Sequence, residues 1–252
     1  ATPPRGAIGT NAFDAIHDQI SEARRILAGL GLNEAQGQTL ISSSECRMAE
    51  AELVALVNPL SSEMDVLRPS LLPGLLTILR HNVSRKNYDV ALFEVGRVFR
   101  RTAEGARAPM EERRVALALT GQRHAPFWSG DDRDAKLDLS DLKGVLDEFL
   151  AQFGLRGVTF TRRAESTALL LESATIQLGG KLSLGQCGQL LPALAKQYDL
   201  RDAVLLAELN LDQLLARRNA AKSFKPLPAF PAIRRDVAML VAEAVTHDAV
   251  LQ

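Results

Sequence analysis

The sequence predicts an α+β fold with an antiparallel sheet flanked by helices. Strand-like runs follow one another in the second half of the chain, and the helical patterns stand apart from them. The pair Gly179-Gly180 separates two of these runs and is typical of a tight β-hairpin turn. Sheets built from sequence neighbours favour antiparallel pairing over a doubly wound parallel sheet.

The chain begins with a helical pattern and short strand-like runs. Asn11 can cap a helix over residues 13–30, where apolar residues recur at three- and four-residue steps, and Gly31 ends it. The β-prone runs that follow are 38–42, 52–58 and 64–67.

A second helix and two long strands follow. Ser70 caps a helix over 71–86, and Pro73 is tolerated in its first turn because an N–H there has no helical partner. Residues 89–100 have almost no continuous polar face, which indicates a buried strand, and 115–120 form another.

The second half continues with a third helix and four strands. Ser140 caps the helix, which carries apolar residues inward as far as Phe153, and Pro192 begins a short further helix. The predicted strands are 158–162, 168–178, 182–187 and 204–209.

The segment 217–231 marks a domain boundary. It is rich in proline, which fixes φ and favours extended neighbours, so it is predicted to be a stiff connector. A new strand, 235–241, is expected beyond it. We therefore assign residues 1–222 to one domain and 223–252 to the start of a second.

Composition excludes several function classes. Thirty basic residues balance thirty acidic ones, so any polyanion must meet a local basic patch. Two cysteines are too few for a disulfide framework or a four-ligand zinc site and favour the cytoplasm. The four histidines lack metal-site spacing, and no run of apolar residues is long enough to span a membrane.

Three stretches of the sequence together resemble one known family. Residues 58–76 (NPLSSEMDVLRPSLLPGLL), followed by 92–99 (LFEVGRVF), are similar to the catalytic-core-like region of the β subunit of bacterial phenylalanyl-tRNA synthetase. Residues 185–192 (GQCGQLLP) with 198–200 and 207–211 are similar to its later half. Residues 224–238 (FKPLPAFPAIRRDVA) resemble the entry to its C-terminal anticodon-binding domain.

The resemblance implies a class II synthetase fold followed by a truncated ferredoxin-like domain. It also implies an α2β2 enzyme that joins phenylalanine to tRNA with ATP and magnesium. In that family the β copy of the fold is a non-catalytic relative that packs against the α subunit and helps to hold tRNA. This chain is therefore expected to bind neither ATP nor magnesium itself.

The residues support loss of catalysis. An active class II site uses arginines to hold the nucleotide, whose phosphate accumulates charge during attack. The strand 92–99 offers Glu94 and Arg97 in the wrong order for the Arg-x-Glu pattern, and Asp212 stands where a late arginine is expected. We predict no catalytic residue. Glu94 and Arg97 line a vestigial pocket or, in the preferred interpretation, form cross-strand ion pairs.

Two sets of residues are candidates for contacts. The apolar face of the second helix either meets another subunit or seals the domain's own core; its residues are Leu72, Leu75, Leu76, Leu79 and Val83. The connector and the following strand carry basic residues that tRNA could contact, namely Arg217, Arg218, Lys222, Lys225, Arg234 and Arg235.

Two alternatives remain open. One is a free-standing class II-like protein that binds an amino acid or a nucleotide, which phenylalanine-dependent ATP–pyrophosphate exchange would reveal. The other is a general nucleic-acid-binding domain that uses the basic connector, whose affinity would fall steeply with salt whatever the RNA.

Overall fold

The chain forms two compact units, Ala1–Ala220 and Ala221–Gln252. The computed structural model describes residues 14–48, 52–101, 109–125, 127–128, 130–219, 230, 233–243, 245 and 247–251. The predicted assignment of 1–222 and 223–252 to two separate domains stays a prediction.

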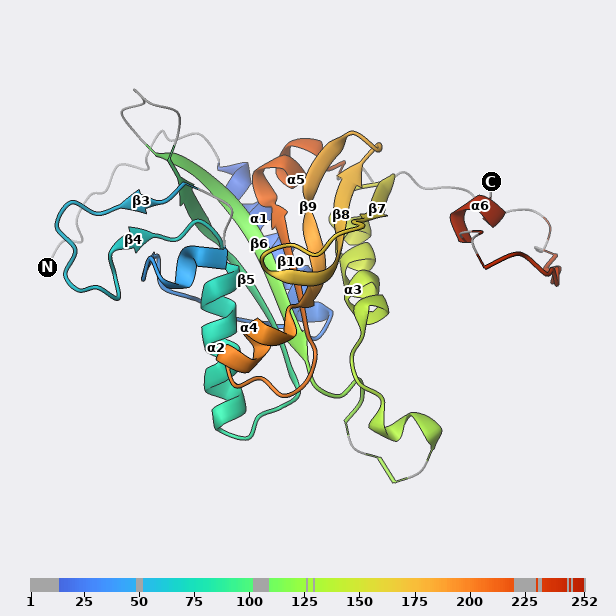
Figure 1. Ribbon diagram of the computed structural model, residues 1–252. Coiled ribbons are helices and arrows are strands. Elements are labelled where there is room, and N and C mark those ends of the chain that lie inside the picture. The colour runs from blue at the N-terminus through green and yellow to red at the C-terminus, as the bar shows by residue number, and fades with distance from the viewer. Residues whose placement is uncertain are drawn as a thin grey trace, which may run out of the picture. The chain divides into compact units, whose positions relative to one another are not determined.

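The first unit is built on a sheet whose described strands follow the order β1-β5-β6-β10-β9-β8-β7 (Figure 1). These are β1 (Asn33–Glu34), β5 (Val90–Arg100), β6 (Met110–Thr120), β7 (Val158–Arg162), β8 (Leu170–Leu178), β9 (Leu182–Leu190) and β10 (Val204–Asn210). All these pairings are antiparallel except that of β1 with β5. The predicted antiparallel sheet is confirmed. The parallel edge strand β1 is too short to show any alternation in the sequence.

Helices cover both faces of this sheet. The helices α1 (Ala15–Gly29), α3 (Leu139–Gln152) and α5 (Leu211–Arg217) pack on one face. The helices α2 (Leu72–Ser84) and α4 (Pro192–Gln197) pack on the other (Figure 1). A small antiparallel sheet of β2 (Leu40–Ile41), β4 (Val66–Leu67) and β3 (Val54–Ala55) and two 3₁₀ turns, Glu45–Met48 and Asp131–Asp134, complete the described elements of this unit.

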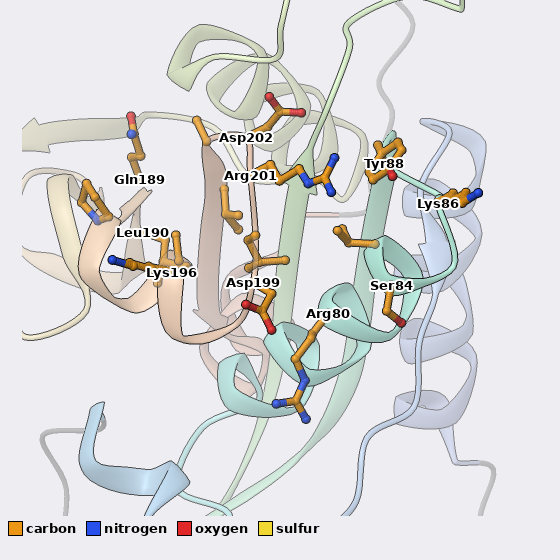
Figure 2. A pocket seen from close by; sticks show the side chains of 16 residues that line it. Arg80, Ser84, Lys86, Tyr88, Gln189, Leu190, Lys196, Asp199, Arg201 and Asp202 are labelled. Carbon is orange, nitrogen blue, oxygen red and sulfur yellow. The ribbon is translucent and has the colours of Figure 1, made fainter.

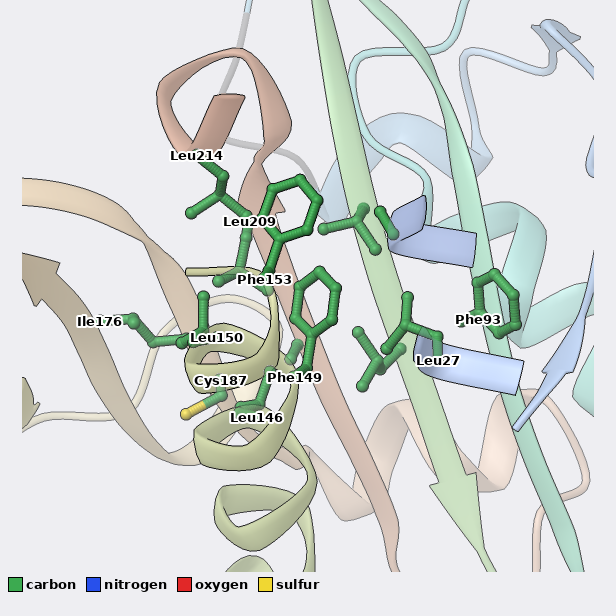
Figure 3. Close-up of a cluster of buried hydrophobic side chains, with 14 of the residues drawn as sticks. Leu27, Phe93, Leu146, Phe149, Leu150, Phe153, Ile176, Cys187, Leu209 and Leu214 are labelled. Carbon is green, nitrogen blue, oxygen red and sulfur yellow. The ribbon is translucent and has the colours of Figure 1, made fainter. Parts of the chain in front are cut away.

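Strand alternation produces a separate core on each face. On the α1 and α3 side, Phe149 and Phe153 stack with their ring centroids 5.6 Å apart, and Leu209 of β10 joins the same cluster (Figure 3). On the α2 side, Leu92 and Leu206 pack beneath the leucines of the helix. Because side chains of the sheet are buried on both faces, its strands read as nearly continuous apolar runs.

The start of α1 differs from the prediction. Its N-cap is Asp14, whose carboxylate accepts the N–H of Ile16 at 3.0 Å. The predicted cap, Asn11, lies outside the described residues. Gly31 follows the helix with φ of +91°, a conformation that glycine adopts without a steric penalty.

The caps of α2 and α3 both differ from the prediction. The N-cap of α2 is Leu71, which makes no side-chain cap hydrogen bond, and Ser70 lies one residue earlier. The hydroxyl of Ser70 still accepts the N–H of Leu72 at 3.1 Å. The cap of α3 is Asp138 rather than Ser140, because Asp138 and Asp141 form a reciprocal capping box. Ser140 instead donates its backbone N–H to Asp138 at 2.7 Å.

The glycines of β9 and of the turn before it have structural roles. Gly179 and Gly180 join the strands with φ of +59° and +69°, which confirms the predicted hairpin turn. In β9, a Cβ added to Gly185 would lie 2.1 Å from the backbone oxygen of Glu208. A Cβ on Gly188 would lie 2.2 Å from the backbone oxygen of Glu172. The strand therefore requires glycine at both positions for close approach of its neighbours.

The second unit contradicts one predicted element. Residues 233–242 form no strand, although 235–241 were predicted to do so. A strand needs a hydrogen-bonded neighbour, and no described residue pairs with this segment. Its large apolar side chains Val237, Met239, Leu240 and Val241 are exposed. The described helix of this unit is α6 (His247–Leu251). No helix in the described parts of either unit has the length and hydropathy to cross a bilayer.

Candidate functional site on the sheet face beneath helix α2

A row of directly paired residues crosses the centre of the sheet. Glu94 of β5 pairs with Ala116 of β6, which pairs with Glu208 of β10, which pairs with Gln186 of β9. Directly opposed residues share a face, and Ala116 belongs to the core beneath α2. Arg114, two residues before Ala116, points to the same side. Two acidic residues and an arginine therefore lie on the same face of the sheet as the apolar core beneath α2.

Glu94 is neutralised by Arg68. Arg68 Nη1 donates to Glu94 Oε1 at 2.6 Å, and the two side chains are only 7% and 2% exposed. Arg68 Nε donates to the backbone oxygen of Arg97 at 2.8 Å, which fixes the guanidinium against β5. Gly96 leaves space for it, since a Cβ there would lie 2.3 Å from Arg68 Nη2. Glu94 Oε2 is buried and has no hydrogen-bond partner among the described residues.

Glu208 connects the sheet to the first turn of α2. Its Oε1 accepts the hydroxyl of Ser70 at 2.9 Å and the backbone N–H of Leu71 at 2.8 Å. These donors lie where a helix has unsatisfied N–H groups and a partial positive charge. A carboxylate at this position therefore stabilises the helix start.

Arg114 balances the charge of Glu208 from the other side. Its Nη1 donates to Glu208 Oε2 at 3.0 Å and its Nη2 to Glu112 Oε2 at 2.8 Å. Burial lowers the pKa of the guanidinium, but the attraction of Glu208 and Glu112 outweighs it, so the pKa of Arg114 is raised. We call Arg68, Glu94, Arg114, Glu112 and Glu208 the buried charge network.

The two residues expected at a vestigial pocket, Glu94 and Arg97, lie on different faces of the sheet. Glu94 and Arg97 are three residues apart in one strand, so their side chains lie on opposite faces. Glu94 pairs with Arg68, whereas exposed Arg97 pairs with Glu111 of β6. The cross-strand ion pair is thus correct for Arg97 and wrong for Glu94. The expectation that both residues line one pocket is also wrong.

Asp212 has a different place from the one expected. The strand β10 ends at Asn210, and Asp212 lies in the first turn of α5. Its carboxylate accepts the backbone N–H and the guanidinium of Arg113, both at 2.8 Å. Arg113, like Arg114, is therefore held by a carboxylate of this chain.

The subunit-interface candidates lie inside the domain. Four of them, Leu72, Leu75, Leu76 and Leu79, are at most 3% exposed and belong to the core beneath α2. Val83 is partly buried against the same core. The apolar face of α2 packs onto the sheet, so the prediction that these four residues form a docking surface is corrected.

The described candidates for tRNA contact differ in how exposed their side chains are. Arg217, Arg234 and Arg235 are exposed, as a contact requires, whereas Lys222 and Lys225 lie outside the described residues. Arg218 is corrected: its side chain is 8% exposed, pairs with Glu22 of α1 at 2.7 Å and lies over the ring of Phe153. Arg218 therefore joins α5 to α1 instead of meeting RNA.

We expect Arg218→Leu to destabilise the chain by about 2 kcal/mol, because Glu22 loses its partner and Phe153 its cation–π contact. Urea unfolding followed by circular dichroism measures this loss. Arg217→Leu, at the exposed neighbouring position, is the control and should change stability by less than about 0.5 kcal/mol. Equal effects of the two changes would contradict the structural role of Arg218.

The two cysteines are buried and free. Burial, with Glu45 and Asp65 nearby, raises the pKa of Cys46 to about 11. Burial likewise raises the pKa of Cys187 to about 11. No three His, Cys, Asp or Glu side chains among the described residues gather as metal ligands would. The residues available in the described part of the chain thus provide neither a reactive thiol nor a metal centre.

A pH dependence follows from the raised pKa values of the thiols. The fold favours the neutral thiols, so their contribution to stability is complete below about pH 9 and is lost as the pH rises through about 11. At pH 8 we expect a thiol reagent to label the native chain at least about a hundredfold more slowly than the urea-unfolded chain. Labelling of native Cys187 at the unfolded rate would contradict its burial.

The sequence alone does not reveal that Arg68, Arg114 and Glu208 belong to one network. A signal was present, because Glu94 and Glu208 each interrupt an apolar strand, and a buried carboxylate needs a partner. The partners could not be named, since Arg68 precedes Glu94 by 26 residues and Arg114 precedes Glu208 by 94.

The fold is that of a class II aminoacyl-tRNA synthetase. A pyrrolysyl-tRNA synthetase from Desulfitobacterium hafniense superimposes with a TM-score of 0.61 at 18% identity, over 80% of this chain and 68% of that one. A second crystal structure of that synthetase gives a TM-score of 0.59 at 19% identity, with the same coverage.

The sequence is more specific than the fold. Residues 1–211 match the phenylalanyl-tRNA synthetase beta chain CLM domain, and the chain belongs to this family. It is 38% identical over 233 residues to the phenylalanine–tRNA ligase beta subunit of Geobacillus kaustophilus. It is 32% identical over 256 aligned positions to that of Lactiplantibacillus plantarum. The chain spans 28% of the Geobacillus protein, so it corresponds to one part of a longer subunit.

Proposed function

We propose that this chain is the part of a phenylalanine–tRNA ligase β subunit that supports the attachment of phenylalanine to tRNA without doing chemistry itself. In this proposal it packs against a catalytic α subunit in a cytoplasmic α2β2 enzyme and helps to hold tRNA. ATP and magnesium are used by the whole enzyme. The observation that carries the proposal is the buried charge network, in which Arg68 and Arg114 are held by carboxylates of this chain.

The network fits a structural role better than nucleotide binding. A nucleotide site needs guanidinium groups that are free to meet phosphate. Arg68 and Arg114 are instead bound by Glu94, Glu208 and Glu112 at 2.6–3.0 Å. A phosphate brought among these carboxylates would be repelled, and removing them would unbalance buried charge. The described residues of this face therefore do not fit ATP with magnesium, and the proposal gives them no catalytic role.

The same network supports a rigid platform for assembly. Glu208 ties β10 to the start of α2, and Arg68 ties the segment before α2 to β5. Domains that dock to a partner bind more tightly when the docking elements need no ordering on association. Packing against the α subunit would use exposed surfaces of this frame, since the α2 leucines are already buried.

Reconstitution tests the proposal. The complete β subunit that contains this chain should co-elute with the α subunit in size-exclusion chromatography, and only the mixture should charge tRNA with phenylalanine. A β subunit carrying Gly185→Ala, which disrupts the sheet, should lose both properties. Phenylalanyl-tRNA formation by the β subunit alone, or full activity of the α subunit alone, would refute the proposal.

A further inference from the structure

A groove lies at the end of the sheet away from the buried charge network. It is formed by the last turns of α2, the turn leading into β5, the end of β9, α4 and the segment 199–204 (Figure 2). Its volume is about 820 Å³. Four cationic side chains line it, and we call it the basic groove: Arg80, Lys86, Lys196 and Arg201.

These four cations differ from the arginines of the network. Each is exposed, and none has a carboxylate within ion-pair distance among the described residues. Two carboxylates also line the groove, and one of these, Asp202, is already paired with Lys136 at 3.1 Å. The groove therefore has a net positive charge that the described part of the chain does not neutralise.

Two of the cations are oriented by aromatic rings. The guanidinium of Arg201 lies 5.4 Å from the ring centre of Tyr88, and that of Arg80 lies 6.0 Å from the ring centre of Tyr198. An arginine held on a ring loses less freedom when it meets a phosphate. Tyr88 is 37% exposed, so part of its surface is available to a flat ligand.

Two turns of the groove carry side chains where helices usually end in glycine. Lys86, just beyond α2, has φ of +67°, and Asp199, just beyond α4, has φ of +54°. Glycine is preferred at such positions because a Cβ is disfavoured there. Lys86 thus places a cation at the groove in a backbone conformation that glycine would adopt at a lower steric cost.

The lining favours RNA over an acidic peptide. A docked peptide helix or strand would need a stripe of large apolar side chains. Leu190, Leu200 and Val204 are at most 8% exposed. The more accessible apolar lining residues have smaller side chains that offer little area to a peptide, namely Val83, Pro192, Ala195 and Ala203. Spread cations with an accessible tyrosine ring suit a flexible strand that offers phosphates and bases together.

We propose that the basic groove binds an unpaired RNA segment through its phosphates, with a base against Tyr88. The inference rests on the proposed function, because it names where in this chain the RNA of that enzyme is held. Arg80, Lys86, Lys196 and Arg201 contact the phosphates, while Tyr88 supplies the stacking surface.

The test compares two charge-matched variants of the complete α–β enzyme. The groove variant combines Arg80→Gln, Lys86→Gln, Lys196→Gln and Arg201→Gln. The control variant removes four exposed cations elsewhere, by Arg25→Gln, Arg156→Gln, Arg163→Gln and Lys181→Gln. Both remove the same charge from exposed positions, and thermal unfolding verifies that each is folded. The measured quantity is the affinity for fluorescent tRNA between 50 and 200 mM salt, about the range over which phosphate contacts are lost.

We expect the groove variant to bind tRNA about tenfold more weakly and to lower the slope of log affinity against log salt by about 3, whereas the control changes little. Tyr88→Leu should weaken binding without changing the slope. Equal losses in both variants, or wild-type affinity of the groove variant, would overturn the inference. Competition for the groove by polyglutamate, without competition by single-stranded RNA, would also overturn the inference. If the wild-type enzyme assembles and charges tRNA but the groove variant binds tRNA normally, only the groove inference is refuted. If the wild-type subunits fail to assemble, the proposed function is refuted.

Discussion

Replacing Arg68 with methionine is expected to cost the chain about 3–5 kcal/mol of folding free energy. The substitution leaves Glu94, whose side chain is 2% exposed, without its charge partner in an apolar core. Desolvation of a carboxylate is far more costly than the packing that methionine retains. Urea unfolding of the wild type and the variant measures the difference.

Two further variants separate charge from packing. Arg68→Met combined with Glu94→Leu should recover most of the lost stability, because no unpaired charge remains. Arg97→Met removes the exposed ion pair with Glu111 and should cost no more than about 1 kcal/mol. A single Arg68→Met variant as stable as Arg97→Met would show that the Arg68–Glu94 pair is not the buried contact described above.

Gly185→Ala is the second substitution expected to lower stability strongly. The added methyl group would lie 2.1 Å from the backbone oxygen of Glu208 and 2.8 Å from the Cα of Leu209. Backbone atoms in the middle of a sheet cannot move aside as a flexible side chain can, so we expect a loss of about 3 kcal/mol or more. A lower midpoint in thermal unfolding, together with reduced hydrogen-exchange protection of β9 and β10, would report it.

The matched control is Gly144→Ala in α3, where an added Cβ meets nothing within 4 Å. Alanine favours a helix interior over glycine, so this variant should gain up to about 1 kcal/mol. If Gly185→Ala is tolerated as well as Gly144→Ala, the close approach of β9 and β10 is wrong.

The long strands and the hairpin could be predicted because their signals are local. Residues 89–100 and the pair Gly179-Gly180 carry their structure in neighbouring side chains, and β5 and the β8–β9 turn appear where expected. The short strand β1 could not be found this way, since two residues show no periodicity and the strand depends on pairing with β5. Residues 235–241 show the converse, because a strand-like pattern alone does not form a strand.

The site was harder to predict than the fold for the same reason. Glu94 and Arg97 are close in sequence, yet the pleat sends their side chains to opposite faces. Arg68 belongs to the segment 58–76, which is distant from Glu94 in the sequence. Only folding brings the two side chains together. Local patterns identify which residues are unusual, and tertiary pairing decides which of them act together.

The buried charge network holds the domain together and performs no chemistry. Phenylalanine-dependent ATP–pyrophosphate exchange tests this role directly, in the assembled α–β enzyme carrying Arg114→Met, Glu112→Gln and Glu208→Gln together. Arg100→Gln is assayed beside it, because the buried Nε of Arg100 has no hydrogen-bond partner among the described residues.

We expect both folded variants to exchange within about threefold of the wild-type rate, since no group that contacts reacting atoms has been removed. A fall of about a hundredfold or more, as the loss of one transition-state donor produces, would contradict the account and place catalytic groups in this chain.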